Sequence, residues 1–236
     1  MNPLPRVLLI DLDDTILDDS ASLETAWDGV AESFGPRTGA PPARLRAAVD
    51  AERAWYWADE ARHRRGRLDL LRARTEVCMG ALRRLGRDDG VTAAAMARDY
   101  GALRDETLRP FPGAVEALAE FRRRGIRLAM ITNGAGSYQR RKIARFELAP
   151  HFEAILVEGE VGYGKPDPRV FRRALGLLDV KPSDAWMVGD DLARDVAGAK
   201  SVGVRAVWVD ARGRGLPADA AARPDRVVRS LAELAG

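Results

Sequence analysis

Short apolar runs recur along the chain, and helical patterns lie between them. Most of these runs lack the polar alternation of a half-exposed strand and are typical of parallel strands covered on both faces. Strands that alternate with helices in this way predict an α/β fold with a parallel sheet. The predicted strands are Val7–Ile10, Ile126–Thr132, Ile155–Val157, Ala185–Val188 and Val204–Val209, with Val227–Val228 as a candidate sixth.

Three of the predicted helices have recognisable first residues. Pro112-Gly113 precedes the first, and Gly125 closes it. Asp167-Pro168 has the residue types of an N-cap followed by a first helical residue. Asp191 or a neighbour begins the third. Each of these helices follows or precedes a predicted strand, as a strand–helix–strand arrangement requires.

The first connection is much longer than the others. A strand–helix–strand unit needs ~30 residues, so about 90 residues between Ile10 and Ile126 are surplus. Their apolar residues recur at three-to-four spacing, which predicts helices. We therefore expect residues 1–17 and 110–236 to form the core domain and residues 18–109 to form an inserted α-helical domain. Leu108–Pro112 is the expected return hinge.

Composition and charge exclude several classes of protein. Of 236 residues, 46% are hydrophobic and 31% charged, which is typical of a globular chain. The 38 basic and 35 acidic residues are interleaved. A nucleic-acid binder would more often concentrate its basic residues in a stripe, so we expect no nucleic-acid partner. No apolar run approaches the ~20 residues of a membrane span, and we expect no membrane partner. Val7–Ile10 is too short for a signal peptide, and one cysteine agrees with a reducing, cytoplasmic location.

Polar residues follow four of the predicted strands. Asp11–Thr15 comes directly after the first strand, and Thr132–Gly134 ends the second. Gly164–Pro168 follows the third, and Gly189–Asp191 follows the fourth. Ligands of open parallel sheets bind beyond the carboxyl ends of the strands. We therefore expect these residues to converge at one rim of the sheet.

The residue types at this rim favour phosphate chemistry. Crowded carboxylates repel one another, and a hard cation relieves the repulsion. Carboxylate and carbonyl oxygens without nearby His or Cys favour Mg²⁺ over zinc. Lys165, one of only four lysines, adds a positive charge for a phosphate group. A carboxylate can accept a phosphoryl group as nucleophile, and a second carboxylate can protonate the leaving oxygen.

The order and spacing of these residues resemble the four motifs of the haloacid dehalogenase-like hydrolase superfamily. The resemblance extends over residues 7 to 210 and rests on Asp11–Thr15, Thr132, Lys165 and Gly189-Asp190 with Asp195. The inserted helical domain is similar to the small α-helical cap of one subfamily. The resemblance implies a Rossmann-like core, Mg²⁺ as cofactor and phosphoryl transfer through an aspartyl-phosphate.

The resemblance also implies a role for each motif residue. Asp11 is expected to be the nucleophile and a metal ligand. Asp13 is expected to be the general acid and base, with its backbone carbonyl on the metal. Asp190 is expected to bind the metal directly. Asp195 and Asp191 are expected to lie next to the metal ligands, and spacing leaves open which of the two matters more.

The remaining motif residues are expected to hold the phosphate group or to orient the acid. Thr132 and the backbone at Asn133 would bind the phosphoryl oxygens. Lys165 would neutralise the phosphate group and the nucleophile. Thr15 would orient Asp13.

The leading interpretation is a Mg²⁺-dependent phosphatase that acts on a small phosphate ester. A dehalogenase of this family has no acid two residues after the nucleophile, so Asp13 argues against that activity. A phosphomutase shares this acid and stays open, whereas a non-catalytic binding protein would have a broken motif, and none is broken. Sugar phosphates, nucleoside monophosphates and acylneuraminate 9-phosphate all stay open as substrates, as does the oligomeric state.

Overall fold

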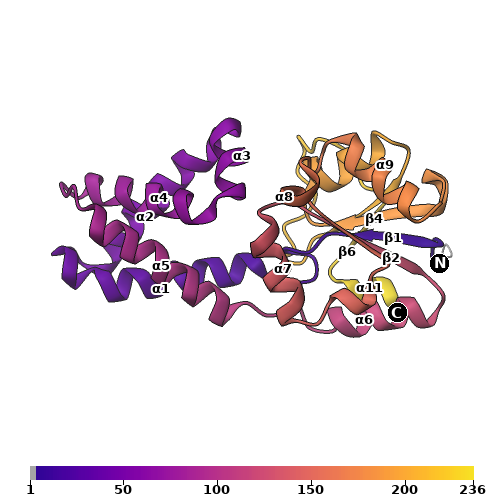
Figure 1. Ribbon diagram of the computed structural model, residues 1–236, viewed down its shortest axis with the longest axis horizontal. Helices are drawn as coiled ribbons and strands as arrows, with labels where there is room; N and C mark the ends of the chain where they lie inside the picture. The colour runs from indigo at the N-terminus through magenta and orange to yellow at the C-terminus, as the bar shows by residue number, and fades with distance from the viewer. Residues whose placement is uncertain (1–3) are drawn as a thin grey trace. The chain divides into compact units, whose positions relative to one another are not determined.

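The computed structural model describes residues 4–236 and divides the chain into two compact units. One unit contains the residues up to Asp18 together with Pro110–Gly236, and the other is Asp19–Arg109. Residues 1–3, the beginning of the predicted core domain, lie outside the described residues. Figure 1 shows the helices and strands of each unit.

The first unit is built on a six-stranded parallel sheet with the order β3-β2-β1-β4-β5-β6. The α/β fold class, with its Rossmann-like parallel sheet, is therefore confirmed. All six predicted strands are present, and their ends differ from the predicted ones by at most one residue. The strands are β1 (Val7–Ile10), β2 (Arg127–Thr132), β3 (Ala154–Val157), β4 (Ala185–Gly189), β5 (Arg205–Val209) and β6 (Arg226–Val228).

Strand β1 lies at the centre of the sheet, which explains its unbroken apolar sequence. Val7 pairs with Arg127 of β2 on one side and with Ala185 of β4 on the other. All four residues of β1 are fully buried. Helix α9 (Pro168–Leu177) covers one face of the sheet, and α6 (Ala114–Arg123) and α11 (Leu231–Ala235) cover the other (Figure 1). A strand covered on both faces needs no polar residue.

Two of the predicted helix starts are confirmed, and at each of them an aspartate side chain caps the helix. The Asp167 carboxylate accepts a hydrogen bond from the Arg169 backbone N–H at the start of α9. Asp191 caps the third helical segment, which is π-helical over Leu192–Ala197 and continues as α10 (Gly198–Lys200). Three further helices of this unit had no predicted counterpart: α7 (Gly136–Arg145), α8 (Glu158–Val161) and α11.

The second unit consists of helices with their own apolar core. Trp27 and Tyr100 stack within this core with ring centroids 3.9 Å apart, and Cys78 is buried in the same core as a free thiol. The buried Arg104 forms an ion pair with the partly buried Asp19. The helices are α1 (Asp19–Phe34), α2 (Pro42–Ala58), α3 (Glu60–Leu68), α4 (Leu70–Arg84) and α5 (Gly90–Thr107).

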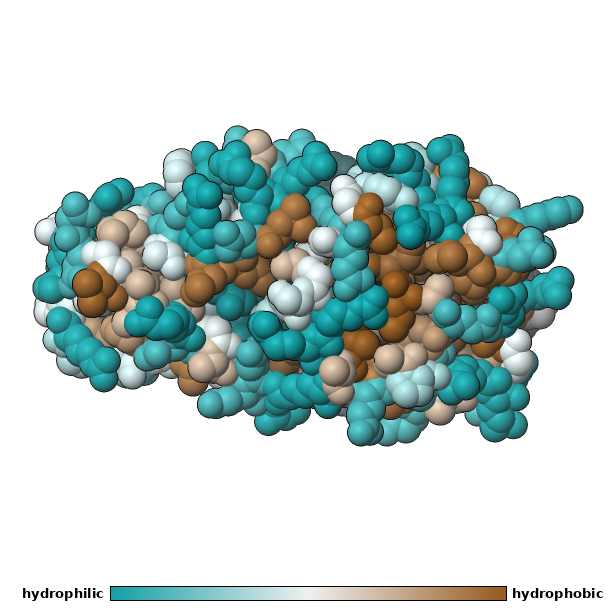
Figure 2. Space-filling model, viewed as in Figure 1, coloured by the Kyte–Doolittle hydropathy of each residue, from teal (hydrophilic) through white to brown (hydrophobic). Residues whose placement is uncertain are grey.

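Hydrophilic side chains cover most of the face seen in Figure 2, with hydrophobic ones between them. Among residues 4–236, no helix has both the length and the apolar character that crossing a membrane requires.

Candidate active site

Three strands of the sheet end next to one another and bring their following residues together. Asp11 follows β1, Thr132 is the last residue of β2, and Asp190 follows β4. Because β1 lies between β2 and β4, the three residues meet at the carboxyl rim of the sheet. A cavity of about 190 Å³ lies there, lined by Asp11, Asp13, Asp14, Thr132, Asn133, Lys165, Asp190, Asp191, Arg194 and Asp195.

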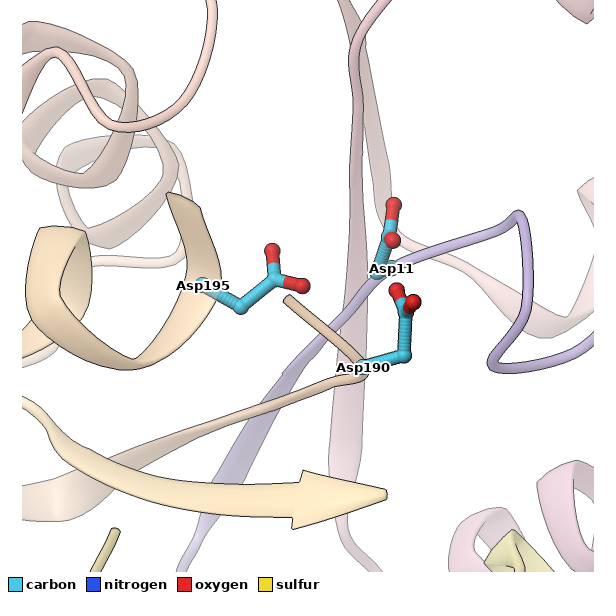
Figure 3. A group of neighbouring side chains, drawn as sticks. All are labelled: Asp11, Asp190 and Asp195. Carbon is cyan, nitrogen blue, oxygen red and sulfur yellow. The ribbon is translucent and has the colours of Figure 1, made fainter. Parts of the chain in front are cut away.

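Three carboxylates form a cluster in this cavity. Asp11, Asp190 and Asp195 each offer an oxygen, and these oxygens lie within 4.8 Å of one another. Figure 3 shows the Asp190 side chain directed toward Asp11, with Asp195 reaching in from the helical segment after β4. Asp195 is completely buried and Asp11 is 7% exposed.

Burial makes this cluster hard to ionise. It raises the pKa of Asp11 to about 7, an effect that the Lys165 charge opposes and the Asp195 charge reinforces. Burial, and then the charges of Asp11 and Asp195, raise the pKa of Asp190 to about 9. Burial also raises the pKa of Asp195. The cluster offers only oxygen ligands with excess negative charge, a donor set that fits a hard divalent cation.

Lys165 supplies the positive charge of the cluster. Its ammonium lies 2.7 Å from Asp11 Oδ1 and 2.6 Å from Asp195 Oδ1. Burial alone would lower the pKa of Lys165, but these two carboxylates raise it above its ordinary value. Lys165 therefore stays protonated, and its one charge is shared by two carboxylates.

The Asn133 side chain fastens the loop that carries Lys165. Its amide donates a hydrogen bond of 2.7 Å to the Lys165 carbonyl, and its Oδ1 accepts one of 2.7 Å from the Lys165 backbone N–H. A Cβ at Gly164 would lie 2.5 Å from Asn133 Oδ1, so the loop needs glycine there. This pairing engages the Asn133 side chain and leaves its backbone as the group available to a phosphoryl oxygen.

The structure separates Asp191 from Asp195, which spacing could not do. Asp195 belongs to the carboxylate cluster, and its Oδ2 accepts a hydrogen bond of 3.0 Å from the Asp191 backbone N–H. The Asp191 carboxylate instead caps the π-helical segment and pairs with Arg194 at 2.8 Å. The indole N–H of Trp208, in β5, donates a hydrogen bond of 2.7 Å to the Asp190 carbonyl. This bond holds the backbone at the end of β4.

Thr15 lacks the contact that we expected of it. Its hydroxyl is buried and makes no hydrogen bond within residues 4–236, so none reaches Asp13. Asp13 is held by two other residues, which the sequence analysis missed. Lys142 Nζ lies 2.6 Å from Asp13 Oδ1, and the Gln139 amide donates to Asp13 Oδ2 at 2.8 Å. One available signal was the scarcity of lysine: Lys142 is one of only four in the chain.

Comparison with known proteins places this site in a family. The family model for haloacid dehalogenase-like hydrolases matches residues 5–203. A phosphoserine phosphatase from Thermus thermophilus is 40% identical over 97% of both chains. A glyceraldehyde 3-phosphate phosphatase from Pyrococcus furiosus is 34% identical over 86% of this chain and 80% of its own. In fold, the chain is similar to a HAD hydrolase from Bacillus subtilis, solved bound to magnesium, with a TM-score of 0.73 and 20% identity over 98% and 97% of the two chains.

Proposed function

The chain belongs to the haloacid dehalogenase-like hydrolase family, and from this premise we propose that it is a Mg²⁺-dependent phosphatase. Its substrate is a small phosphate ester, and the reaction passes through an aspartyl-phosphate on Asp11. Two relatives named as phosphatases cover most of the chain, one acting on phosphoserine and one on glyceraldehyde 3-phosphate. Both names denote esters of three-carbon compounds, which makes this size of substrate the first to test.

One observation carries the proposal: a second carboxylate, Asp13, lines the same cavity as Asp11. Phosphate ester hydrolysis needs a proton for the leaving oxygen, whereas release of a halide does not. Asp13 therefore favours a phosphatase over a dehalogenase on this fold. A phosphomutase remains the second candidate, because it would use the same two carboxylates.

In the proposed first step, an Asp11 oxygen attacks phosphorus and the bond from phosphorus to the ester oxygen breaks. The electron pair goes to the leaving oxygen, which takes a proton from Asp13. In the second step Asp13 removes a proton from water, and the water oxygen attacks the phosphorus of the aspartyl-phosphate. The Asp11 carboxylate is released together with inorganic phosphate.

The other residues of the cavity stabilise charge on the transferring group. Lys165 stands beside Asp11 and would neutralise phosphoryl oxygens as they approach. Thr132 and the backbone at Asn133 are the proposed hydrogen-bond donors to those oxygens. Asp11, Asp190 and the Asp13 carbonyl would hold Mg²⁺. When bound, Mg²⁺ supplies positive charge that offsets the carboxylates and the phosphate group.

A panel of esters assayed for released phosphate tests this function. The panel holds phosphoserine, glyceraldehyde 3-phosphate, a nucleoside monophosphate and p-nitrophenyl phosphate, each with Mg²⁺ or with EDTA. We expect turnover of at least one ester in Mg²⁺ and none in EDTA. Chloride release from 2-chloropropionate is measured alongside. Chloride release without phosphate release would contradict the proposal, and full phosphate release in EDTA would contradict the metal requirement.

The pH dependence of stability tests the carboxylate cluster as a metal site. The raised pKa values of Asp11 and Asp190 mean that the metal-free folded state binds more protons than the unfolded state above about pH 4. Their contribution to stability is therefore present at low pH and lost as pH rises through about 7 and 9. We expect the metal-free Tm to fall from pH 6 to pH 9, and Mg²⁺ to raise Tm more at pH 9 than at pH 6.

The matched variants are Asp190→Asn and Asp219→Asn, an exposed aspartate. Asp190→Asn should flatten the metal-free pH dependence and reduce the Mg²⁺ shift in Tm, while Asp219→Asn should leave both as in the original chain. Differential scanning fluorimetry measures all of these. An equal Mg²⁺ shift in both variants would mean that Asp190 is not a metal ligand.

We further propose that residues 18–109 form the cap domain and that this domain selects the substrate. In support, the phosphoserine phosphatase is similar to this chain over 97% of both chains, which includes the helical unit. We expect orthovanadate, an analogue of the transferring phosphate, to slow amide hydrogen exchange at Leu108–Pro112. Unchanged exchange there, with vanadate bound at the Asp11 site, would argue against a hinge at these residues.

A further inference from the structure

Helix α7 directs polar side chains into the interior. Gln139 is 2% exposed and Lys142 is 5% exposed, and they lie three residues apart on one face of the helix. Burying an amide and an ammonium is costly unless both are hydrogen-bonded. Their partners therefore indicate what this face of α7 does.

The partner of Lys142 is the proposed acid. Its ammonium lies 2.6 Å from Asp13 Oδ1, and it also lies over the Tyr138 ring at 4.7 Å from the ring centroid. The ammonium is thus placed between a carboxylate and an aromatic face. These two contacts constrain the position of the ammonium against Asp13.

Gln139 contacts both Asp13, the proposed acid, and Thr132, a proposed hydrogen-bond donor to the phosphoryl oxygens. A carboxylate can only accept hydrogen bonds, so the amide nitrogen must face Asp13, and it does so at 2.8 Å from Oδ2. The same nitrogen lies 2.6 Å from Thr132 Oγ1. Because the Gln139 amide donates to the Thr132 oxygen, the Thr132 hydroxyl must donate its own hydrogen elsewhere. In the structure that hydroxyl donates a long hydrogen bond of 3.4 Å to the Asn133 carbonyl, which a phosphoryl oxygen could replace.

Each oxygen of Asp13 therefore accepts a hydrogen bond from α7. From this geometry we infer that Gln139 and Lys142 are positioning residues: they fix the Asp13 carboxylate for proton transfer and, through the Gln139 amide, the Thr132 hydroxyl for the phosphoryl oxygens. The inference rests on the proposed phosphatase function, since it assigns these residues to the Asp13 step of that reaction.

The test uses two probes whose leaving groups differ in basicity, phenyl phosphate and p-nitrophenyl phosphate. Lys142→Met and Gln139→Met keep the side-chain length and remove the donors. A misplacement of about 1 Å can cost ~10²-fold in rate. We expect the rate of phosphoenzyme formation from phenyl phosphate to fall ~10- to 100-fold. The rate of formation from p-nitrophenyl phosphate, whose leaving group needs less protonation, should fall clearly less. Lys142→Arg should restore much of the loss, because it keeps a charged donor.

A double variant separates positioning from a general structural role. If Lys142 acts through Asp13, then Lys142→Met in the Asp13→Asn background should cause no further loss. The matched control is Arg140→Gln, on the same helix, which removes a surface ion pair with Glu160 and should keep kcat for both probes. Circular dichroism and Tm establish folding, and Gln139→Met carries the test if Lys142→Met does not fold.

Equal losses in the rate of phosphoenzyme formation from both probes, or fully additive losses in the double variant, would overturn the inference. So would Gln139→Met and Lys142→Met variants that match Arg140→Gln in activity. The proposed function fails in a different way, since the unmodified chain would then hydrolyse neither probe.

Discussion

The variant Asp11→Asn is expected to lose multiple turnover of phosphate esters by at least about 10⁴-fold, a size of loss seen when a nucleophile is removed. The amide cannot accept the phosphoryl group to form an acyl phosphate, so no covalent intermediate forms. Steady-state phosphate release and acid quenching of the reaction measure the two effects.

The loss should not come from unfolding. Burial raises the pKa of Asp11, so the fold itself disfavours a charge at this position. A neutral amide of the same shape also relieves repulsion from Asp195 and Asp190. We expect the metal-free Tm to be maintained, and undiminished multiple turnover by this variant would contradict the assignment of the nucleophile.

The variant Asp13→Asn is expected to lose ~10²- to 10⁴-fold of kcat for phenyl phosphate, the usual worth of general acid and base catalysis. The nucleophile remains, so the aspartyl-phosphate should form and then accumulate, because no base activates the water. The loss in the rate of phosphoenzyme formation should be smaller for p-nitrophenyl phosphate. Stopped-flow release of p-nitrophenolate should show a burst followed by slow turnover.

Two outcomes would contradict the role of Asp13. The first is an equal loss in the rate of phosphoenzyme formation for both esters, which would show that Asp13 does not protonate the leaving group. The second is rapid turnover without a burst, which would show that another group activates the water.

The strands could be predicted from the sequence because the sheet is buried between layers of helices. Val7–Ile10 is paired on both edges and covered on both faces, so it had to be apolar throughout. Gly136–Arg145 was missed as a helix for the opposite reason. It buries Gln139 and Lys142 alongside apolar residues, and a polar buried face leaves little hydrophobic period to detect.

The convergence of Asp11, Thr132 and Asp190 could be predicted because the carboxyl ends of parallel strands meet at one edge of the sheet. Side-chain contacts between distant segments could not be predicted in this way. Lys142 reaches Asp13 across 129 positions of sequence, and no local spacing encodes such a contact. The separate roles of Asp191 and Asp195 also depended on three-dimensional structure, because the turn after β4 decides which carboxylate enters the cluster.

In the proposed mechanism Asp11 carries the phosphoryl group during turnover. The direct measurement is peptide mass spectrometry of the unmodified protein after acid quenching during hydrolysis of an active ester, with Asp13→Asn used to accumulate the intermediate. We expect one phosphorylated residue, Asp11, whose phosphoryl group disappears when the quench follows complete hydrolysis. A phosphoryl group on Asp13 or on any residue other than Asp11, or none in either protein during turnover, would contradict it.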